Sequence, residues 1–414
     1  MSEVLRPSAS SFAPVSASLA AMTRTALRAP AETGSAPRSL KILHVLRAPV
    51  GGLFRHVVDV AQGQAARGHR VGVIADSSTG GARADAVLAQ LAPQLALGLH
   101  RLAIARQIGW RDIHALYFVA RRIAALRPDV VHGHGAKGAA LVRLAPRTDG
   151  AIRVYTPHGG SLGYAAGTLA GRFYHTLERL LNWRTDLFLF ESGYIAQEFR
   201  IKVGRPRALA RVVRNGVGEA EFAPIAARPD ASELVYVGEL RILKGIDVLF
   251  EALALLKERG RTPCATIAGE GPDGAQLRAQ ALRLGLGDQV CFVGHRPARE
   301  ALAMGRILVV PSRAESLPYV ILEAAAAGTP IVASRVGGIP EIFGTEASHL
   351  VLPGNAAALA GAIAKALDDP VELHRVAAAI NARVRSQFSV NAMVDGGLAA
   401  YREALAIRKV AQFA

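Results

Sequence analysis

The stretch from Ser312 to Pro330 reads SRAESLPYVILEAAAAGTP and indicates a strand, a short loop and a helix in succession. The apolar run 307–310 just before it is typical of a buried parallel strand. We expect the helix to have Ser316 as its N-cap and Pro318 in its first turn, and to end at Gly328. The first N–H groups of such a helix have no partners within it, so the stretch predicts an anion site that suits a phosphate group.

Two glutamates flank this predicted phosphate site. Glu315 precedes the helix, and Glu323 lies about two turns along it. Carboxylates repel phosphate but accept hydrogen bonds from hydroxyl groups, so the pattern suits a diphosphate with hydroxyl-rich groups on both sides. A nucleotide sugar has that composition. Taken alone, the two glutamates are equally consistent with a turn cap and a solvated helix residue.

Short apolar runs alternate with amphipathic stretches from Leu40 to the end of the chain. This alternation predicts an α/β fold of two doubly wound, Rossmann-like domains that face each other across a cleft. We assign residues 39–215 to the first domain, 216–388 to the second, and 389–414 to a helix that crosses back to the first. Residues 1–38 are rich in Ser, Ala and Pro, and we predict a disordered tail.

The expected strands can be placed from these apolar runs. In the first domain they are 41–46, 71–75, 128–131, a strand from Arg153 that ends before His158, 186–190 and 211–213. In the second domain they are 233–237, 265–268, 290–293, 307–310, 331–333 and 349–352. Open α/β sheets bind ligands beyond the carboxyl ends of such strands.

Several strand ends carry candidate ligand contacts. The pair Gly51-Gly52 follows the first strand, and the run from Gly238 to Gly245 places Arg241 and Lys244 within reach of a diphosphate. The turn Gly269-Glu-Gly271 allows close approach of a ligand to the backbone. Each of these turns, taken alone, is equally consistent with an ordinary loop between a strand and a helix.

Histidines also follow two strands, at His132, His134 and His158. No carboxylate or cysteine completes a ligand set at the usual spacing, and the glycine between the first two favours a loop. We therefore predict no metal site.

The composition limits the class of protein. The chain has 414 residues, of which 51% are hydrophobic, so both domains can form a core. It contains no run of eighteen apolar residues, so no transmembrane helix is predicted. Cys264 and Cys291 lie in apolar runs, and we expect reduced core residues, as in a cytosolic protein.

The net charge of +16 is concentrated in the first domain, where residues 39–215 hold 25 Lys and Arg and 10 Asp and Glu. This excess favours an anionic partner. We find no nucleic-acid recognition module, so nucleic acid is not expected. The stretch from Trp110 to Arg127 mixes Tyr117 and Phe118 with Arg121 and Arg122, which favours an anionic membrane surface. A helix that packs on a sheet with its arginines in water explains the same pattern.

Taken together, these motifs resemble those of the retaining, nucleotide-sugar-dependent glycosyltransferases of family 4, which have the GT-B fold. The most specific part runs from Glu315 to Glu323 and is similar to the E-x7-E motif of that family. The stretches 328–330 and 336–341 support the resemblance, as do Gly51-Gly52 and the strand ends at 131–134 and 156–159. The resemblance covers the chain from about Lys41 onward.

The resemblance implies an acceptor-side first domain and a second domain that binds the nucleotide sugar. It implies catalytic roles for Glu315, at the donor sugar hydroxyls, and for His134, near the transferred sugar. The implied donor-binding residues are Gly52 and Lys244 at the diphosphate, Glu323 at the ribose, and also Arg241, Gly269, Gly271, Ser316 and Leu317. Many relatives carry an arginine where this chain has Glu239, and Arg241 is the candidate replacement.

The resulting prediction is a cytoplasmic, metal-independent and cofactor-free hexosyltransferase that retains the donor's configuration. Its acceptor is a saccharide or a lipid-linked saccharide for a surface polysaccharide, with a peripheral location on the inner face of the membrane. A nucleotide-sugar epimerase and a non-catalytic sugar-nucleotide-binding protein are the alternatives. A nicotinamide dehydrogenase is not favoured, because no Gly-x-Gly-x-x-Gly follows a first strand.

Overall fold

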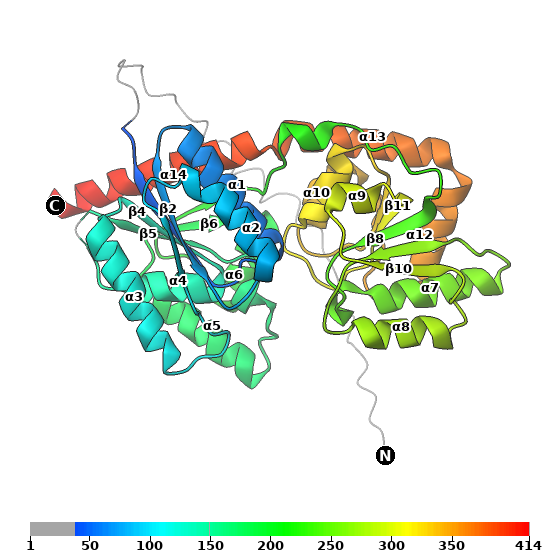
Figure 1. Ribbon diagram of the computed structural model, residues 1–414, viewed down its shortest axis with the longest axis horizontal. Helices are drawn as coiled ribbons and strands as arrows, with labels where there is room; N and C mark the ends of the chain where they lie inside the picture. The colour runs from blue at the N-terminus through cyan, green and yellow to red at the C-terminus, as the bar shows by residue number, and fades with distance from the viewer. Residues whose placement is uncertain (1–37, 149, 414) are drawn as a thin grey trace. The chain divides into compact units, whose positions relative to one another are not determined.

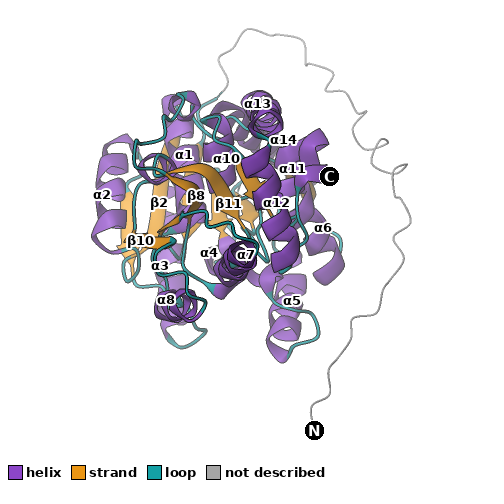
Figure 2. Cartoon of the chain, turned by 90° about the vertical axis from the view of Figure 1, so that its right-hand side faces the viewer, coloured by secondary structure: helices purple, strands orange, loops and turns teal. Residues whose placement is uncertain are grey.

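Two parallel β-sheets, each covered by helices, organise the chain from residue 39 onward (Figure 1). The structure is a computed structural model that describes residues 38–148 and 150–413. The predicted disordered tail, residues 1–38, lies outside the described residues except for Arg38. Residues 39–414 form one unit, and in Figure 2 its strands lie in the interior with helices around them.

The first sheet has seven parallel strands in the order β3-β2-β1-β4-β5-β6-β7. Its strands are β1 Lys41–Leu46, β2 Arg70–Asp76, β3 Leu99–Leu102, β4 Val130–His134, β5 Ile152–Thr156, β6 Leu187–Phe190 and β7 Leu209–Val212. Its helices are α1 Gly51–Ala66, α2 Gly81–Leu91, α3 Arg111–Leu126, α4 Gly135–Leu144, α5 Leu169–Asn182 and α6 Gly193–Lys202. This is the doubly wound arrangement that the alternating pattern predicts.

The two faces of this sheet are covered by different helices. Because side chains alternate along a strand, Leu43 and Val45 of β1 point to one face and pack with α3 and α4. Leu46 points to the other face and packs with α1 and α2. Ile42, on the same face as Leu46, packs with the last helix, α14 (Val390–Phe413).

The second sheet has five parallel strands in the order β10-β9-β8-β11-β12. Its strands are β8 Ser232–Val237, β9 Ala265–Ala268, β10 Val290–Gly294, β11 Gly305–Val310 and β12 Ile331–Ala333. Its helices are α7 Ile246–Glu258, α8 Gly274–Arg283, α9 Ala298–Leu302, α10 Tyr319–Ala326, α11 Ile339–Phe343, α12 Ala356–Asp368 and α13 Pro370–Gln387. Helices α7, α8 and α12 pack on one face, and α10, α11 and α13 pack on the other.

Helix α14 returns from the second sheet to the first (Figure 1, red). Its residues Val394, Leu398 and Tyr401 pack against the first-sheet residues Ile42 and Val130. Among the described residues, no helix combines the length and the apolar content needed to cross a bilayer.

The helix after β11 begins later than the sequence analysis predicts. Pro318 occupies the N-cap position of α10 with an extended backbone, and Ser316 does not cap the helix. The physical reason is the proline, because the residue before a proline is driven out of the helical region. The predicted end is confirmed: the helix finishes at Ala326, and Gly328 follows in the left-handed conformation that closes many helices.

Two strand assignments also change. The predicted strand 349–352 is wrong: residues 344–349 form a 3₁₀ helix, and only a single bridge joins Val351 to Ser334. Strand β3 was missed, because its sequence LHRL has too few apolar residues to stand out in a region without clear periodicity.

The two cysteines are exposed, so their prediction as core residues is wrong. Cys264 precedes β9, and Cys291 lies on β10, which is the edge strand of its sheet. One face of an edge strand can point to solvent, so an apolar run there does not guarantee burial.

Candidate active site

Glu315 and Lys244 meet beyond the carboxyl ends of β11 and β8. Lys244 Nζ lies 2.8 and 2.9 Å from the two carboxylate oxygens of Glu315, and the Ser312 hydroxyl donates to the same carboxylate at 2.7 Å. The Glu315 side chain is 9% exposed and that of Lys244 is 27% exposed. Each member of the pair therefore neutralises the other at the place where the sequence predicts a phosphate and a sugar.

The loop that carries Glu315 is held from the other side by an ion pair. Both terminal nitrogens of Arg313 donate to the carboxylate of Asp247 on α7, at 2.6 and 2.7 Å. Such a two-point contact fixes direction as well as distance. The loop is thus anchored before it reaches the first turn of α10, whose free N–H groups face the same region.

The first sheet brings its own strand ends to this loop. A Cβ placed on Gly52 in the first turn of α1 comes within 3.2 Å of the Tyr319 ring, and one on Gly159 comes within 3.8 Å of Ser316. The amide of Asn215 donates to the carbonyl oxygen of Leu317 at 3.0 Å. The N-termini of α1 and α10 therefore lie close together, and both offer unpaired N–H groups.

Glu323 makes an ion pair across the two sheets. Its carboxylate bonds to Arg55 of α1, which also contacts Glu221 at 2.5 Å and Asp59 at 3.3 Å. The Arg55 guanidinium lies 4.8 Å from the centre of the Tyr319 ring. Burial raises the pKa of Glu323, and burial also raises the pKa of Asp59 to about 6, although Arg55 opposes both shifts.

A second contact across the sheets involves Glu341 at the start of α11. Its carboxylate accepts from the backbone N–H groups of Gly193 and Tyr194 at 3.1 and 2.8 Å, and it pairs with Arg214 at 3.3 Å. Those N–H groups begin α6, where a negative charge is favoured. Sequence reasoning did not single out this residue for such a role.

The glycines after β9 have a packing role. A Cβ on Gly269 would come within 1.8 Å of the Gly238 carbonyl oxygen, and one on Gly271 would come within 2.4 Å of the Leu240 carbonyl oxygen. The turn therefore packs directly on the loop that leads to Lys244. In that loop Arg241 lies 3.8 Å from Glu239, and both side chains are exposed at 41% and 52%.

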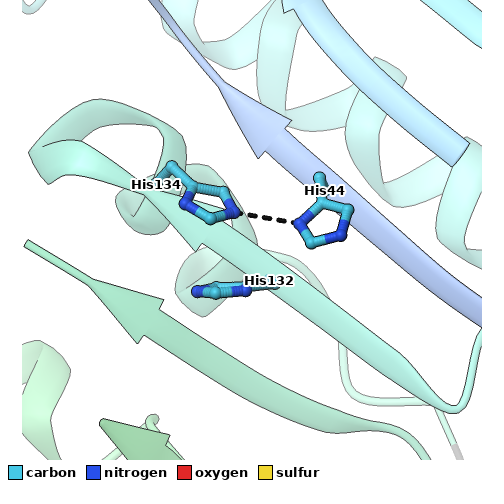
Figure 3. A group of neighbouring side chains, drawn as sticks. All are labelled: His44, His132 and His134. Atoms are coloured by element: carbon cyan, nitrogen blue, oxygen red, sulfur yellow. Dashed lines mark hydrogen bonds between the residues drawn. The ribbon is translucent and has the colours of Figure 1, made fainter. Parts of the chain in front are cut away.

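Histidines form a hydrogen-bonded chain beneath the strand ends. His44 of β1 pairs in register with His132 of β4, and His134 lies two residues further on the same face (Figure 3). His44 Nε2 is 2.9 Å from Gln64 Oε1, His44 Nδ1 is 2.9 Å from His134 Nε2, and His134 Nδ1 is 3.1 Å from His158 Nε2. An amide oxygen only accepts, so Gln64 requires the proton on His44 Nε2, and each following ring then donates through Nε2.

The hydrogen-bonded chain of histidines bears on the expected catalytic role of His134 near the transferred sugar. The residue is 1% exposed, and both of its ring nitrogens are engaged by neighbouring histidines. His158, at the end of β5, is the outermost ring of the chain. A ligand could therefore reach a ring nitrogen of His134 only by displacing His44 or His158.

The cluster contains further histidines and is neutral. His132 bonds to the Tyr401 hydroxyl at 2.7 Å and to the Thr156 hydroxyl at 2.8 Å, and His56 bonds to the Asn215 amide oxygen at 3.0 Å. Burial lowers the pKa of His44 and His56 to about 4 and lowers those of His132, His134 and His158 well below the usual value.

A metal ion fits this cluster poorly. Ring nitrogens of His44, His132 and His134 lie within 4.8 Å of one another, as do those of His56, His134 and His158. However, both ring nitrogens of His132 and of His134 already take part in hydrogen bonds. A metal would have to displace those partners.

Glu191, at the end of β6, is a further buried group that the sequence analysis missed. It is 1% exposed, and its carboxyl oxygens lie near the backbone N–H groups of His158 and Gly159 without reaching hydrogen-bond geometry. Burial raises the pKa of Glu191 to about 7. Its place in the run LFLFES after an apolar strand was the only signal available.

Two family models match the chain. The model described as "Glycosyltransferase Family 4" matches residues 50–221, and the one described as "Glycosyl transferases group 1" matches residues 218–385. Together they cover residues 50–385, which contain every strand of the two sheets except β1, and their boundary lies in the connection between β7 and β8.

The chain is also similar to named proteins. A glycogen synthase of Mycobacterium tuberculosis is 33% identical over 369 residues, which span 82% of this chain and 88% of the relative. A D-inositol 3-phosphate glycosyltransferase of Acidothermus cellulolyticus is 31% identical, over 74% of this chain and 70% of the relative.

Solved structures share the fold. A sucrose-phosphate synthase of Thermosynechococcus elongatus superposes with a TM-score of 0.73 at 21% identity, over 89% of this chain and all of that one. The Anabaena protein HepE in complex with UDP-glucose superposes with a TM-score of 0.71 at 20% identity, over 89% of this chain and 99% of that one.

Proposed function

We propose, because this chain belongs to glycosyltransferase family 4 and has the GT-B fold, that it transfers a hexosyl group from a nucleotide-sugar donor to a hydroxyl acceptor with retention of configuration. The observation that carries the proposal is the Lys244–Glu315 pair beside the first turn of α10. A cation, a hydroxyl-accepting carboxylate and unpaired N–H groups meet there, as a sugar diphosphate requires.

Each residue then has a role in donor binding. The proposed diphosphate ligands are Lys244 and the first N–H groups of α1 and α10, including that of Gly52, with Arg241 at the outer edge. Glu315 accepts hydrogen bonds from the sugar hydroxyls, and Glu323 accepts from the ribose hydroxyls after exchanging its contact with Arg55. Ser316 and the backbone of Leu317 precede α10 beside the proposed diphosphate, whereas the Leu317 side chain is 2% exposed and packs in the core of the second domain. Gly269 and Gly271 support the Lys244 loop and hold it in place.

The proposed chemistry needs no protein nucleophile. The bond between the sugar C1 and the diphosphate oxygen breaks, and the acceptor oxygen forms its bond to C1 on the same face of the sugar. The acceptor proton passes to the departing diphosphate oxygen, so charge and atoms balance. Lys244 and the helix N-termini stabilise the negative charge that grows on the leaving group, which is greatest in the transition state.

We propose that this step requires neither a metal ion nor a cofactor. Lys244 and the N–H groups of two helices supply the positive potential that a divalent cation supplies elsewhere. The histidine chain supports the sugar side of the site: His158 faces the ligand, and His134 positions it.

The proposed acceptor is a saccharide or a lipid-linked saccharide used in surface polysaccharide synthesis, and the proposed location is cytoplasmic, at the inner face of the membrane. The two unpaired cysteines favour a reducing compartment. The excess of basic residues in the first domain favours an anionic membrane surface as partner. At the N-cap of α3 and on the helix itself, Trp110, Ile113 and Tyr117 are 60–76% exposed, and the Arg121 guanidinium lies 5.8 Å from the centre of the Tyr117 ring.

The experiment is a thermal-shift panel of nucleoside diphosphates and their sugars, each with and without a chelator. We expect one nucleotide family to raise the melting temperature, and the shift to survive chelation, because a ligand that binds only the folded protein stabilises it by mass action. No shift with any donor contradicts the donor site, and loss of the shift on chelation contradicts metal independence.

Product analysis with the stabilising donor then separates the alternatives. Transfer of the sugar to an added acceptor with the donor's anomeric configuration supports the proposal. An altered sugar that remains attached to the nucleotide identifies an epimerase, and binding without turnover identifies a non-catalytic protein.

A further inference from the structure

Helix α5 and its C-cap residue expose four large apolar side chains. They lie four, seven and three positions apart in the sequence, so they follow one side of the helix as a stripe. The α5 stripe consists of Leu169, Phe173, Leu180 and Trp183, which are 85%, 55%, 65% and 65% exposed. The opposite side of the helix carries His175, Glu178 and Asn182, which are 2–4% exposed. In this orientation the helix exposes the stripe and buries polar side chains, whereas an ordinary surface helix buries its apolar side.

The orientation of α5 is fixed by a buried ion pair. Glu178 accepts from Arg143 of α4 at 2.8 Å, from the Tyr155 hydroxyl at 2.9 Å and from the Ser161 hydroxyl at 2.8 Å. The Arg143 side chain is completely buried and lies 4.0 Å over the Tyr155 ring. Rotating the helix to bury the stripe would break these bonds and expose or strand two charges, which is costly.

Positive charge lies beside the exposed stripe. Arg172 and Arg179 of α5 are seven residues apart and lie along one side of it, and a pocket beside Leu180 and Trp183 is lined by Arg179, Arg205 and Arg207. The Arg207 guanidinium lies 3.2 Å from the centre of the Trp183 ring. Apolar side chains with a tryptophan at one end and arginines at the sides are the composition of helices that lie in a membrane interface.

We propose that the α5 stripe docks on an anionic lipid bilayer, with Leu169, Phe173, Leu180 and Trp183 entering the interface and the surrounding arginines meeting the head groups. The charge of the first domain selects this occupant, because residues 39–215 hold 25 basic and 10 acidic residues. A second copy of the chain docked through the same surface would bring two positive surfaces together and be repelled. An anionic bilayer is attracted by the same surface.

The position of α5 in the sequence connects the proposed docking surface to the candidate active site. The helix begins thirteen residues after Thr156 ends β5, on the same connection that carries His158 and Gly159 to the candidate active site. Docking would hold this edge of the first domain at the bilayer, where a lipid-linked acceptor presents its saccharide. This docking rests on the membrane partner in the proposed function and identifies the surface that binds it. The test needs no donor, acceptor or turnover, so its outcome is separate from that of the donor-binding experiment.

The experiment is flotation of the purified full-length protein with vesicles of phosphatidylcholine alone or with phosphatidylglycerol added. The test variant is Leu169→Ser/Leu180→Ser, which replaces two exposed apolar side chains and leaves the buried side of α5 unchanged. The matched control is Leu282→Ser/Val371→Ser, two residues of the second domain that are 70% and 81% exposed. Thermal melting checks that both variants are folded.

We expect the wild type to float only with phosphatidylglycerol vesicles and to be released by salt, because both apolar insertion and charge contribute. The test variant should partition at least about 10-fold less, and the control should match the wild type. Equal binding of test variant and wild type overturns the proposal, as does no binding of the wild type. Loss of binding only in an Ile113→Ser/Tyr117→Ser variant assigns the surface to α3. A dimer of the wild type that the test variant abolishes assigns it to a second copy.

Discussion

Replacing Lys244 by methionine tests the centre of the candidate site, because it removes the cation and keeps most of the side chain's volume. In the wild type, Lys244 Nζ contacts both oxygens of Glu315, whose side chain is 9% exposed. The variant leaves that carboxylate with the Ser312 hydroxyl as its partner in the structure. Two losses follow, one in the stability of the second domain and one in donor affinity.

The stability loss can be bounded from the exposure of the two groups. Breaking a fully buried pair costs about 3–5 kcal/mol, and breaking an exposed pair costs about 0–1 kcal/mol. Because Lys244 is 27% exposed and Glu315 is 9% exposed, we expect about 1–2 kcal/mol. For a domain of this size that lowers the melting temperature by about 2–8 °C. The double variant Lys244→Met/Glu315→Gln should recover much of the loss, because it no longer leaves an unpaired carboxylate.

The affinity loss follows from the proposed contact with the diphosphate. A hydrogen bond to a charged group is worth about 1.5–3 kcal/mol, so calorimetry should show a nucleoside diphosphate bound about 10–100-fold more weakly. The control is Lys257→Met in the same domain, where the amine donates to the Gly285 carbonyl oxygen at 2.6 Å and, among the described residues, to no carboxylate. Unchanged melting and unchanged affinity in Lys244→Met would refute both the pairing and the proposed role.

Three further substitutions test other parts of the site. Glu315→Gln should lower turnover about 100-fold with a native circular dichroism spectrum, because a preorganised polar contact is lost; wild-type turnover would remove Glu315 from the mechanism. Arg55→Met should lower the melting temperature more at about pH 8 than at about pH 5, because burial raises the pKa of Asp59 to about 6 and also raises that of Glu323, so both carboxylates carry charge without their cation at the higher pH. An equal loss of melting temperature at the two pH values would contradict this ion-pair network. Burial raises the pKa of Glu191 to about 7 in the folded protein, so the folded state keeps a proton that the unfolded state loses, and stability falls as pH rises from about 4.5 to 7. Glu191→Gln removes that fall, so the melting temperature of the variant should exceed that of the wild type at about pH 8 and approach it at about pH 4. A difference in melting temperature that does not change with pH would argue against a raised pKa of Glu191.

The fold and the centre of the site could be predicted from local sequence patterns. Parallel strands buried on both faces give apolar runs, so β1, β9 and β12 have the predicted bounds within a residue. Glu315 and Lys244 are 71 positions apart in the sequence, yet both follow a strand of the same sheet, and the strand-end rule brings them together.

Contacts that depend on register and on helix rotation could not be predicted. His44 and His134 are 90 positions apart, and they meet only because β1 pairs with β4 in one particular register. Periodicity shows that α5 is amphipathic but not which side faces inward. That choice depends on the ion pair of Glu178 with Arg143, a partner on another helix.

The two ion pairs of the site have a common consequence for donor binding. Glu315 is paired with Lys244, and Glu323 is paired with Arg55, so each proposed donor-binding carboxylate has a cation as its partner. A sugar diphosphate can replace both sets of contacts at once, since its phosphates compete for the lysine while its hydroxyl groups donate to the carboxylates. The charges are held in place and partly desolvated before the donor arrives, which lowers the cost of organising the site. Free phosphate can take the lysine but has no sugar hydroxyl groups to donate to the two glutamates, so it leaves Glu315 without a cation and with the Ser312 hydroxyl as its partner. The arrangement therefore favours a ligand that carries hydroxyl groups on both sides of its diphosphate over simple anions.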